Sequence, residues 1–370
     1  AHDPERLAMH LRAAGNPGDA AGHAATAAAR AAEALAFDRA AALYRLTLEL
    51  REQAGWSDAD EESRRLRIAL GDALANAGRG RAAADEMLRA ARSATARERR
   101  GLERRAAEQL LRSGHIDEAV LLMADVLRTA GLTLPSSPVR ALPSLMLGRA
   151  RIRLRGLRYQ VRAAADVSPA LLERIDLVWS MANVLGLVDT LRGADFQSRH
   201  LLLALEAGEP TRVARALATE AGYAATGGNA GRRRATMILA EARAALAATD
   251  EPNAHGQVRF AQALLAFLDG RFAAALEEFG SAERIFRERC RGMSWEINTA
   301  RGFALWSLLY RGELAEAARR SDSHLRDARD RGDRFALCVL AGALPNLVWL
   351  VRDDAAGARA VLAEAMSQWS

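Results

Sequence analysis

Few residues in this chain have both the type and the spacing that catalysis or metal binding requires. Its seven histidines and two cysteines, Cys290 and Cys338, form no HExxH, CxxC or zinc-finger pattern. All 52 basic residues are arginine, so the lysine that holds phosphate groups in P-loop proteins and protein kinases is absent. No G-x-S-x-G elbow occurs, and the stretch His324-Leu-Arg-Asp327 lies in a helical pattern instead of a kinase catalytic loop. We therefore expect a non-catalytic chain without a cofactor or a bound metal.

A glycine-rich stretch at residues 226–234, TGGNAGRRR, is the nearest approach to a phosphate site. Backbone N–H groups at the start of a helix can hold a phosphate, and arginines follow here. The stretch lacks the P-loop spacing, however. The interpretation we prefer is a turn between two helices that carries exposed arginines.

A second candidate is an arginine-rich segment inside residues 126–165, which contain no acidic residue. Apolar residues recur through it at spacings of three and four, which predicts a basic amphipathic helix. Such a helix can bind nucleic acid or an anionic membrane surface, or dock on an acidic protein face. The alternative is a solvated connector helix whose arginines pair with acids elsewhere. The arginines in question are Arg149, Arg151, Arg153, Arg155, Arg158 and Arg162.

A third candidate is a group of polar residues within an otherwise apolar helical pattern. In a helical array they could line a concave groove and bind a protein or peptide through one aromatic anchor and several hydrogen-bonding groups. The alternative is hydrogen bonding between helices that fixes their packing. The residues are Trp179, Asn183, Asp189, Asp195, Gln197 and His200.

A recurring turn indicates the helices that would position these residues. It consists of a small residue, Gly, a few polar residues and then an Ala-rich helix start. It occurs at residues 77–83 and 113–119, and again near Gly270 and Gly312. The glycines are 36 residues apart in the first case and 42 in the second. Ala, Leu, Arg and Glu dominate, and runs of β-branched residues are missing. We predict an all-α, tetratricopeptide-like helical-repeat solenoid of antiparallel helix pairs, with small residues such as Gly71 allowing close approach.

Prolines divide this array. Pro135, Pro138 and Pro143 predict a break in the helices, and Ser168-Pro169 predicts a helix start. We therefore expect an N-terminal array over residues 1–131, a Pro-containing linker with the basic amphipathic helix over 132–168, and a C-terminal array over 169–370. Both ends of the chain lack the usual boundary signals, which favours a region of a longer protein.

The overall composition indicates a cytoplasmic setting. No secretory signal opens the chain, and the two cysteines lie far apart, as in a reducing compartment. The net charge of +6 permits an anionic partner without requiring one. Residues 335–351 are almost wholly apolar but are interrupted by Pro345, so we expect a buried helix pair there and no transmembrane segment.

Several stretches resemble one family. Residues 153–159 (RLRGLRY), 175–180 (IDLVWS), 187–205 (LVDTLRGADFQSRHLLLAL) and 345–349 (PNLVW) are similar to the C-terminal helical region of large bacterial signalling proteins. In these proteins, common in myxobacteria, a serine/threonine protein kinase domain and an AAA-type, STAND-like ATPase precede an Ala-rich array. The resemblance implies a regulatory interaction and sensor region whose partner is a protein, a peptide or the upstream domains. The alternative is nucleic-acid or anionic-membrane binding through residues 149–162.

Overall fold

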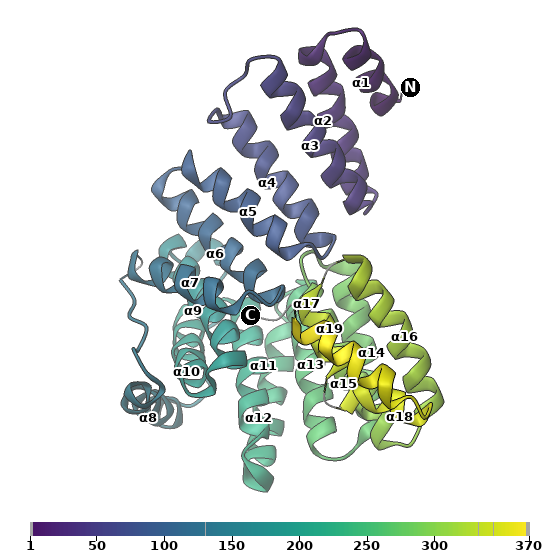
Figure 1. Ribbon diagram of the computed structural model, residues 1–370. Coiled ribbons are helices and arrows are strands. Elements are labelled where there is room, and N and C mark those ends of the chain that lie inside the picture. Colours follow the sequence, from purple (N-terminus) through teal and green to yellow (C-terminus); the bar gives the residue numbers. More distant parts are fainter. Residues whose placement is uncertain (1–2, 130, 332, 343, 368–370) are drawn as a thin grey trace. The chain divides into compact units, whose positions relative to one another are not determined.

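The computed structural model describes residues 3–129, 131–331, 333–342 and 344–367 (Figure 1). These residues form nineteen α-helices and two short 3-10 helices, and no strand occurs among them. The all-α helical-repeat class predicted from the sequence is confirmed. The chain divides into two compact units near residue 130, and residues 132–168 belong to the second unit.

In the first unit each helix packs against the next one along the chain. Its core is built largely from alanines, because the helices approach closely where side chains are small. The helices are α1 (Pro4–Ala13), α2 (Pro17–Glu33), α3 (Phe37–Gln53), α4 (Glu61–Asn76), α5 (Gly80–Arg92), α6 (Ala96–Arg112) and α7 (Ile116–Thr129).

The second unit continues the pairing with longer helices, which follow one another side by side from α9 to α15. They are α8 (Pro138–Arg155), α9 (Pro169–Val188), α10 (Thr190–Ala207), α11 (Pro210–Ala225), α12 (Gly228–Leu246), α13 (Pro252–Leu268), α14 (Phe272–Arg289), α15 (Ser294–Tyr310), α16 (Leu314–Arg331), α17 (Arg334–Ala341), α18 (Leu347–Val351) and α19 (Ala355–Ser367). Two 3-10 turns, η1 (Ala164–Asp166) and η2 (Leu344–Asn346), lie between them.

The recurring turn places a residue with positive φ between the two helices of a pair. Gly78, Gly114 and Gly312 have φ values of 79°, 80° and 75°. Leu35, between α2 and α3, and Asp353, between α18 and α19, adopt φ values of 60° and 56° at the corresponding place. The turn geometry is therefore kept even where the residue is not glycine, at a cost of about 1–2 kcal/mol for a side chain in the left-handed region.

Small residues also set the distance between helices. A Cβ built on Gly71 of α4 would lie 3.2 Å from Cγ of Met87 in α5, and one on Gly256 of α13 only 2.3 Å from Cε1 of Phe286 in α14. Met87 and Phe286 are fully buried. The predicted close approach of paired helices through small residues is confirmed.

The proline-rich stretch differs partly from its prediction. Residues 132–135 have no regular structure, as expected, and α8 begins at Pro138, capped by Ser137. Pro143, however, lies inside α8 and does not break it. A proline here removes the hydrogen bond to the carbonyl four residues earlier and crowds that carbonyl, a cost that the packed face of α8 outweighs.

The prediction of one basic helix reaching Arg162 is wrong. Helix α8 ends at Arg155, because Gly156 takes φ 71° and ψ −172°, a conformation essentially restricted to glycine. The chain then runs without helix along the end of α10, where the Arg162 N–H donates to the Gly208 carbonyl at 3.0 Å. Arg158 and Arg162 are therefore not on α8.

The apolar stretch near the C-terminus forms α17, η2 and α18. Phe335, Leu340 and Val348 are buried, as expected, whereas Leu347, Leu350 and Val351 of α18 are exposed. No single helix of the described residues has the length and apolarity to cross a membrane. Arg334–Ala341 and Leu344–Val351 would together pass by length and composition, but they are bent by 66°.

Candidate functional site

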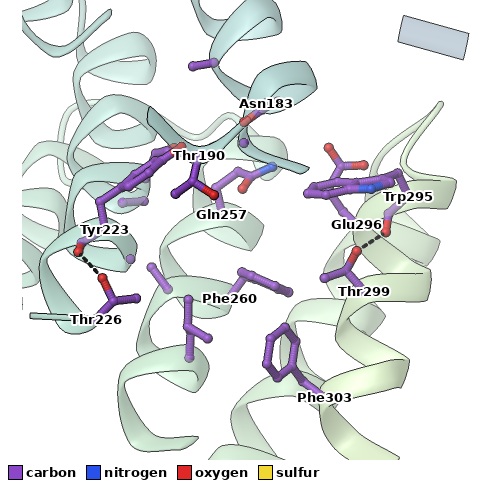
Figure 2. Close-up of a pocket in the computed structure, with 17 residues that line it drawn as sticks. Asn183, Thr190, Tyr223, Thr226, Gln257, Phe260, Trp295, Glu296, Thr299 and Phe303 are labelled. Atoms are coloured by element: carbon purple, nitrogen blue, oxygen red, sulfur yellow. Dashed lines mark hydrogen bonds between the residues drawn. The ribbon is translucent and has the colours of Figure 1, made fainter. Parts of the chain in front are cut away.

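The first helices of four successive pairs in the second unit, α9, α11, α13 and α15, surround a pocket of about 410 Å³ (Figure 2). This volume lies in the range of roughly 300–1,000 Å³ that is usual for ligand pockets. The C-terminal turn of α11 and the first residue of α10 complete the lining. The lining residues are Ala182, Asn183, Gly186, Thr190, Ala218, Thr219, Gly222, Tyr223, Thr226, Gln257, Phe260, Ala261, Leu264, Trp295, Glu296, Thr299 and Phe303.

The pocket exists because neighbouring helices present side chains of different size. Helix α9 contributes Ala182 and Gly186, and α11 contributes Ala218 and Gly222, each pair four residues apart on one helix face. Small side chains at these positions leave the space open. On α13 and α15 most lining residues are larger, and these helices supply Phe260, Trp295 and Phe303.

An aromatic cluster supports the floor. Phe279 of α14 is fully buried, lies face to face with Phe303 at 5.3 Å between ring centroids, and meets Phe260 edge-on at 5.4 Å. Phe260 and Phe303 are half-buried and point into the pocket, as Figure 2 shows. Because Phe279 fixes both rings from behind, the floor is preorganised for contact with an apolar group.

Polar groups form the rest of the lining. Asn183, Thr190 and Gln257 lie together on one side of the pocket, and Trp295, Glu296 and Thr299 come from α15 (Figure 2). Thr299 Oγ1 donates to the Trp295 carbonyl and Thr226 Oγ1 to the Tyr223 carbonyl, each at 2.8 Å. These two hydroxyls are therefore turned back to their own helices.

The electrostatics of the pocket are simple. Among the seventeen described lining residues Glu296 is the only one with an acidic or basic side chain, and that side chain is buried. Tyr223 stays neutral, since burial raises the pKa of its phenol and Glu220 adds to the rise, while Arg149 opposes it. The lining is thus mainly apolar, with one acidic side chain and no basic one among these residues, a poor environment for an acidic ligand.

A half-buried ion network holds α9 against α11 and so fixes one side of the pocket. Arg212 donates to Asp176 from Nε at 3.1 Å and from Nη2 at 2.6 Å, and Arg215 donates from Nη2 at 2.6 Å. Arg215 also lies 4.1 Å from the centre of the Trp179 ring. Burial alone would raise the pKa of Asp176, but the two arginines outweigh it and hold the pKa below its ordinary value.

Of the six residues nominated from the sequence for a groove, Asn183 lines this pocket. The other five lie outside its lining. Trp179 is packed under Arg215, and Asp189 caps α10 by accepting from the Arg192 N–H at 3.1 Å. The remaining three, Asp195, Gln197 and His200, are fully buried.

The three buried residues have partners inside the fold. Asp195 pairs with Arg199 at 2.7 Å, and Gln197 donates from Nε2 to the Ala216 carbonyl at 3.0 Å. His200 Nδ1 lies 3.2 Å from Gln197 Oε1, and burial holds the pKa of its imidazole well below the usual value. With no exposed surface, their side chains can reach a partner only if the helix packing opens. The Gln197 bond joins α10 to α11, whereas these contacts of Asp195 and His200 lie within α10.

The six arginines singled out in the sequence also fall into two groups, according to whether they have a partner in the fold. Arg149 forms an ion pair with the buried Glu220 of α11, and Arg155 donates to the Leu205 carbonyl at 3.0 Å. The exposed Arg151, Arg153, Arg158 and Arg162 make no ion pair with any acid that the structure describes. In the glycine-rich stretch 226–234, residues 226–227 form the turn between α11 and α12, and residues 228–234 begin α12, where Arg232 pairs with Asp269 at 3.1 Å.

Sequence reasoning missed most of the pocket, above all Tyr223, Gln257, Phe260 and Phe303. A signal for them was present: small residues four apart on the first helix of one pair and aromatic residues on the first helices of later pairs. The position of a residue within the helix-pair repeat, rather than the density of polar residues, identifies the surface on which a helical array leaves space for a ligand.

No protein-family model matches this chain, and no curated protein matches it. Among solved structures, the chain matches a crystal structure of the P58(IPK) TPR domain at 13% identity, over 93% of this chain and 87% of that one. The TM-score of that match is 0.22, too low for a shared global arrangement. The assignment as a helical-repeat array therefore stands on the chain's own helix pairs and their turns.

Proposed function

We propose that the second unit is a protein-interaction and sensor module, which binds a segment of a partner protein in the pocket between α9, α11, α13 and α15. The observation that carries the proposal is the convergence of four successive first helices on one preorganised pocket with an aromatic floor and a polar rim. An apolar pocket with a few polar groups is the usual form of a recognition site.

The chemistry of the lining favours a particular kind of segment. Phe260, Leu264 and Phe303 suit a bulky apolar side chain, and Asn183 and Gln257 supply hydrogen-bonding groups beside it. The described lining contains no basic side chain, so an acidic segment would find no counter-charge there. The main attraction is apolar burial, so binding should depend little on salt.

The wider setting belongs to the same proposal. The resemblance of residues 187–205 and of the other stretches to bacterial signalling proteins supports a regulatory region of a larger, cytoplasmic serine/threonine kinase–ATPase protein. Partner binding would then bias a two-state parent, provided that the partner prefers one of its states.

The test is capture of a partner by variants that fill the pocket. Asn183→Arg with Gln257→Arg places two long charged side chains in the cavity from half-buried rim positions. The matched control is Ala240→Arg with Ala244→Arg, which adds the same side chains at exposed positions of α12. Circular dichroism checks that both proteins are folded.

We expect the unmodified chain and the α12 variant to capture the same discrete protein from nuclease-treated lysate, both at low salt and at ~0.5 M salt, where exposed charges are screened. The pocket variant should lose it. Equal capture by the pocket variant would refute this site, and material that is lost with salt and nuclease would shift the function to the arginines.

A further inference from the structure

Helix α8 carries an apolar face that nothing in the described structure covers. Leu154 is 89% exposed, Val139 71%, Met146 60% and Leu147 51%. With the exposed Pro143 and Ala150 they recur at steps of three and four residues, so they form one continuous stripe along the helix. Isolated exposed leucines are common on protein surfaces, but a stripe along a whole helix is not.

The same helix has a second apolar face, which packs on the protein. Ala141, Leu145, Gly148 and Ile152 are buried, and α8 packs against α10, where a Cβ on Gly148 would lie 2.9 Å from Cβ of Ser198. At ~100° per residue, the centres of the buried face and of the exposed stripe are about 180° apart around the helix axis. The exposed stripe is therefore directed straight away from the body of the second unit.

Arginines border the stripe on both sides. By the same helical geometry Arg140 and Arg151 lie along one edge and Arg153 along the other. All three are exposed, and none makes an ion pair with a described residue. No acidic residue occurs in α8 or anywhere in residues 126–165, so the positive charge of this face is not offset locally.

We infer that this face of α8 docks on the surface of a lipid bilayer that contains anionic headgroups. The apolar stripe would enter the boundary between headgroups and acyl chains, and the bordering arginines would lie among the phosphate and carboxylate groups. Arginine suits such an edge, because its aliphatic stem can follow the apolar stripe while the guanidinium stays with the headgroups.

Other occupants of this face fit the observations less well. A nucleic acid would contact the arginines but leave Val139, Met146 and Leu154 exposed to water, since its backbone offers phosphates and no apolar groups. A second copy of α8 would bring like charges together along both edges of the stripe. The inference concerns a surface separate from the pocket, so it stands independently of the proposed partner binding.

Sedimentation of the full chain with lipid vesicles tests the inference. We expect binding to vesicles of phosphatidylcholine with 30% phosphatidylserine and little binding to vesicles of phosphatidylcholine alone. The variant Arg151→Gln with Arg153→Gln should weaken the anionic binding by roughly 25-fold, at about fivefold per arginine near an anionic surface. The variant Leu147→Ser with Leu154→Ser should weaken it at least tenfold, since two buried apolar side chains are lost.

A control on another helix separates the stripe from general surface character. Met237→Ser with Arg233→Gln changes one exposed apolar residue and one exposed arginine on α12 and should leave vesicle binding unchanged. The inference is overturned if anionic vesicles do not bind the chain, if the α8 variants bind like the α12 control, or if duplex DNA binds tightly and Leu147→Ser with Leu154→Ser leaves that binding intact.

Discussion

Asp176 offers the sharpest test of how the pocket is held together. Its carboxylate accepts three hydrogen bonds from Arg212 and Arg215, and these bonds join α9 to α11. Breaking a buried ion pair by removing one partner costs about 3–5 kcal/mol. The Asp176 side chain is 25% exposed, so water screens part of this interaction. We therefore expect Asp176→Ala to lower the local stability of this helix contact by about 2–3 kcal/mol.

Hydrogen–deuterium exchange followed by mass spectrometry is the appropriate assay, because a two-unit chain need not unfold in one step. A loss of 2–3 kcal/mol corresponds to exchange about 30- to 150-fold faster in peptides from α9 and α11. Peptides from α2 and α3, in the other unit, serve as the internal reference and should not change. Acceleration below about fivefold, or equal acceleration in both units, would refute the reasoning.

The pH dependence of stability gives an independent test of the direction in which the pKa of Asp176 is shifted. The folded-state pKa of Asp176 lies below its unfolded value of about 3.9, so the ion network stabilises the fold fully above that value. The stabilisation is lost as the pH falls from about 4 through the lowered pKa. Asp176→Asn has no carboxylate to titrate, so its stability deficit should shrink below pH 4. A deficit that stays constant from pH 7 to pH 3 would contradict the assignment.

Two further predictions concern packing and titration in the same unit. Gly256→Ala should destabilise the protein by about 1–3 kcal/mol, because the added Cβ would lie 2.3 Å from the Phe286 ring. A Cβ at Gly280 would have no neighbouring atom within 4 Å beyond the backbone of its own helix, so Gly280→Ala should stabilise the protein by up to about 1 kcal/mol through helix propensity. Urea denaturation measures both, and an equal effect of the two substitutions would show that the close approach is not as described. Burial, aided by Arg301, lowers the pKa of His324 to about 4, so stability should be complete above pH 6.5 and fall as the pH drops from 6.5 to 4. His324→Gln should flatten that slope in thermal unfolding, leaving the part due to the buried His200, and an unchanged slope would exclude His324 as its source.

The sequence predicted the fold well because the relevant signals are local. Positive-φ glycines at the turns, caps such as Ser168 before Pro169, and small residues at helix contacts act within a few residues of chain. The end of α8 shows the limit of periodicity: an apolar and basic pattern continued past Gly156, but the backbone conformation that only glycine adopts ended the helix there.

The pocket could be predicted less well, because it depends on which faces of separate helices meet. A polar residue in an apolar helix can line a groove or satisfy a partner inside the core, and the sequence pattern is the same in both cases. Asn183 lines the pocket, whereas Gln197 donates to the Ala216 carbonyl in the core. Likewise Arg149 pairs with the buried Glu220, whereas Arg153 is exposed, although both lie in one arginine-rich run.

The ion pair between Arg149 and Glu220 joins the two surfaces that we propose. It ties α8, whose outer face is directed to lipid, to α11, whose Thr219 and Tyr223 line the pocket. Burial raises the pKa of Glu220 and Arg149 opposes that rise, so loss of Arg149 would leave an acid buried without its main counter-charge. This ion pair thus joins α8 to the helices of the pocket within one compact unit. Lipid docking would then promote capture of a membrane-bound partner by raising its effective concentration at the pocket, without any change of conformation in between.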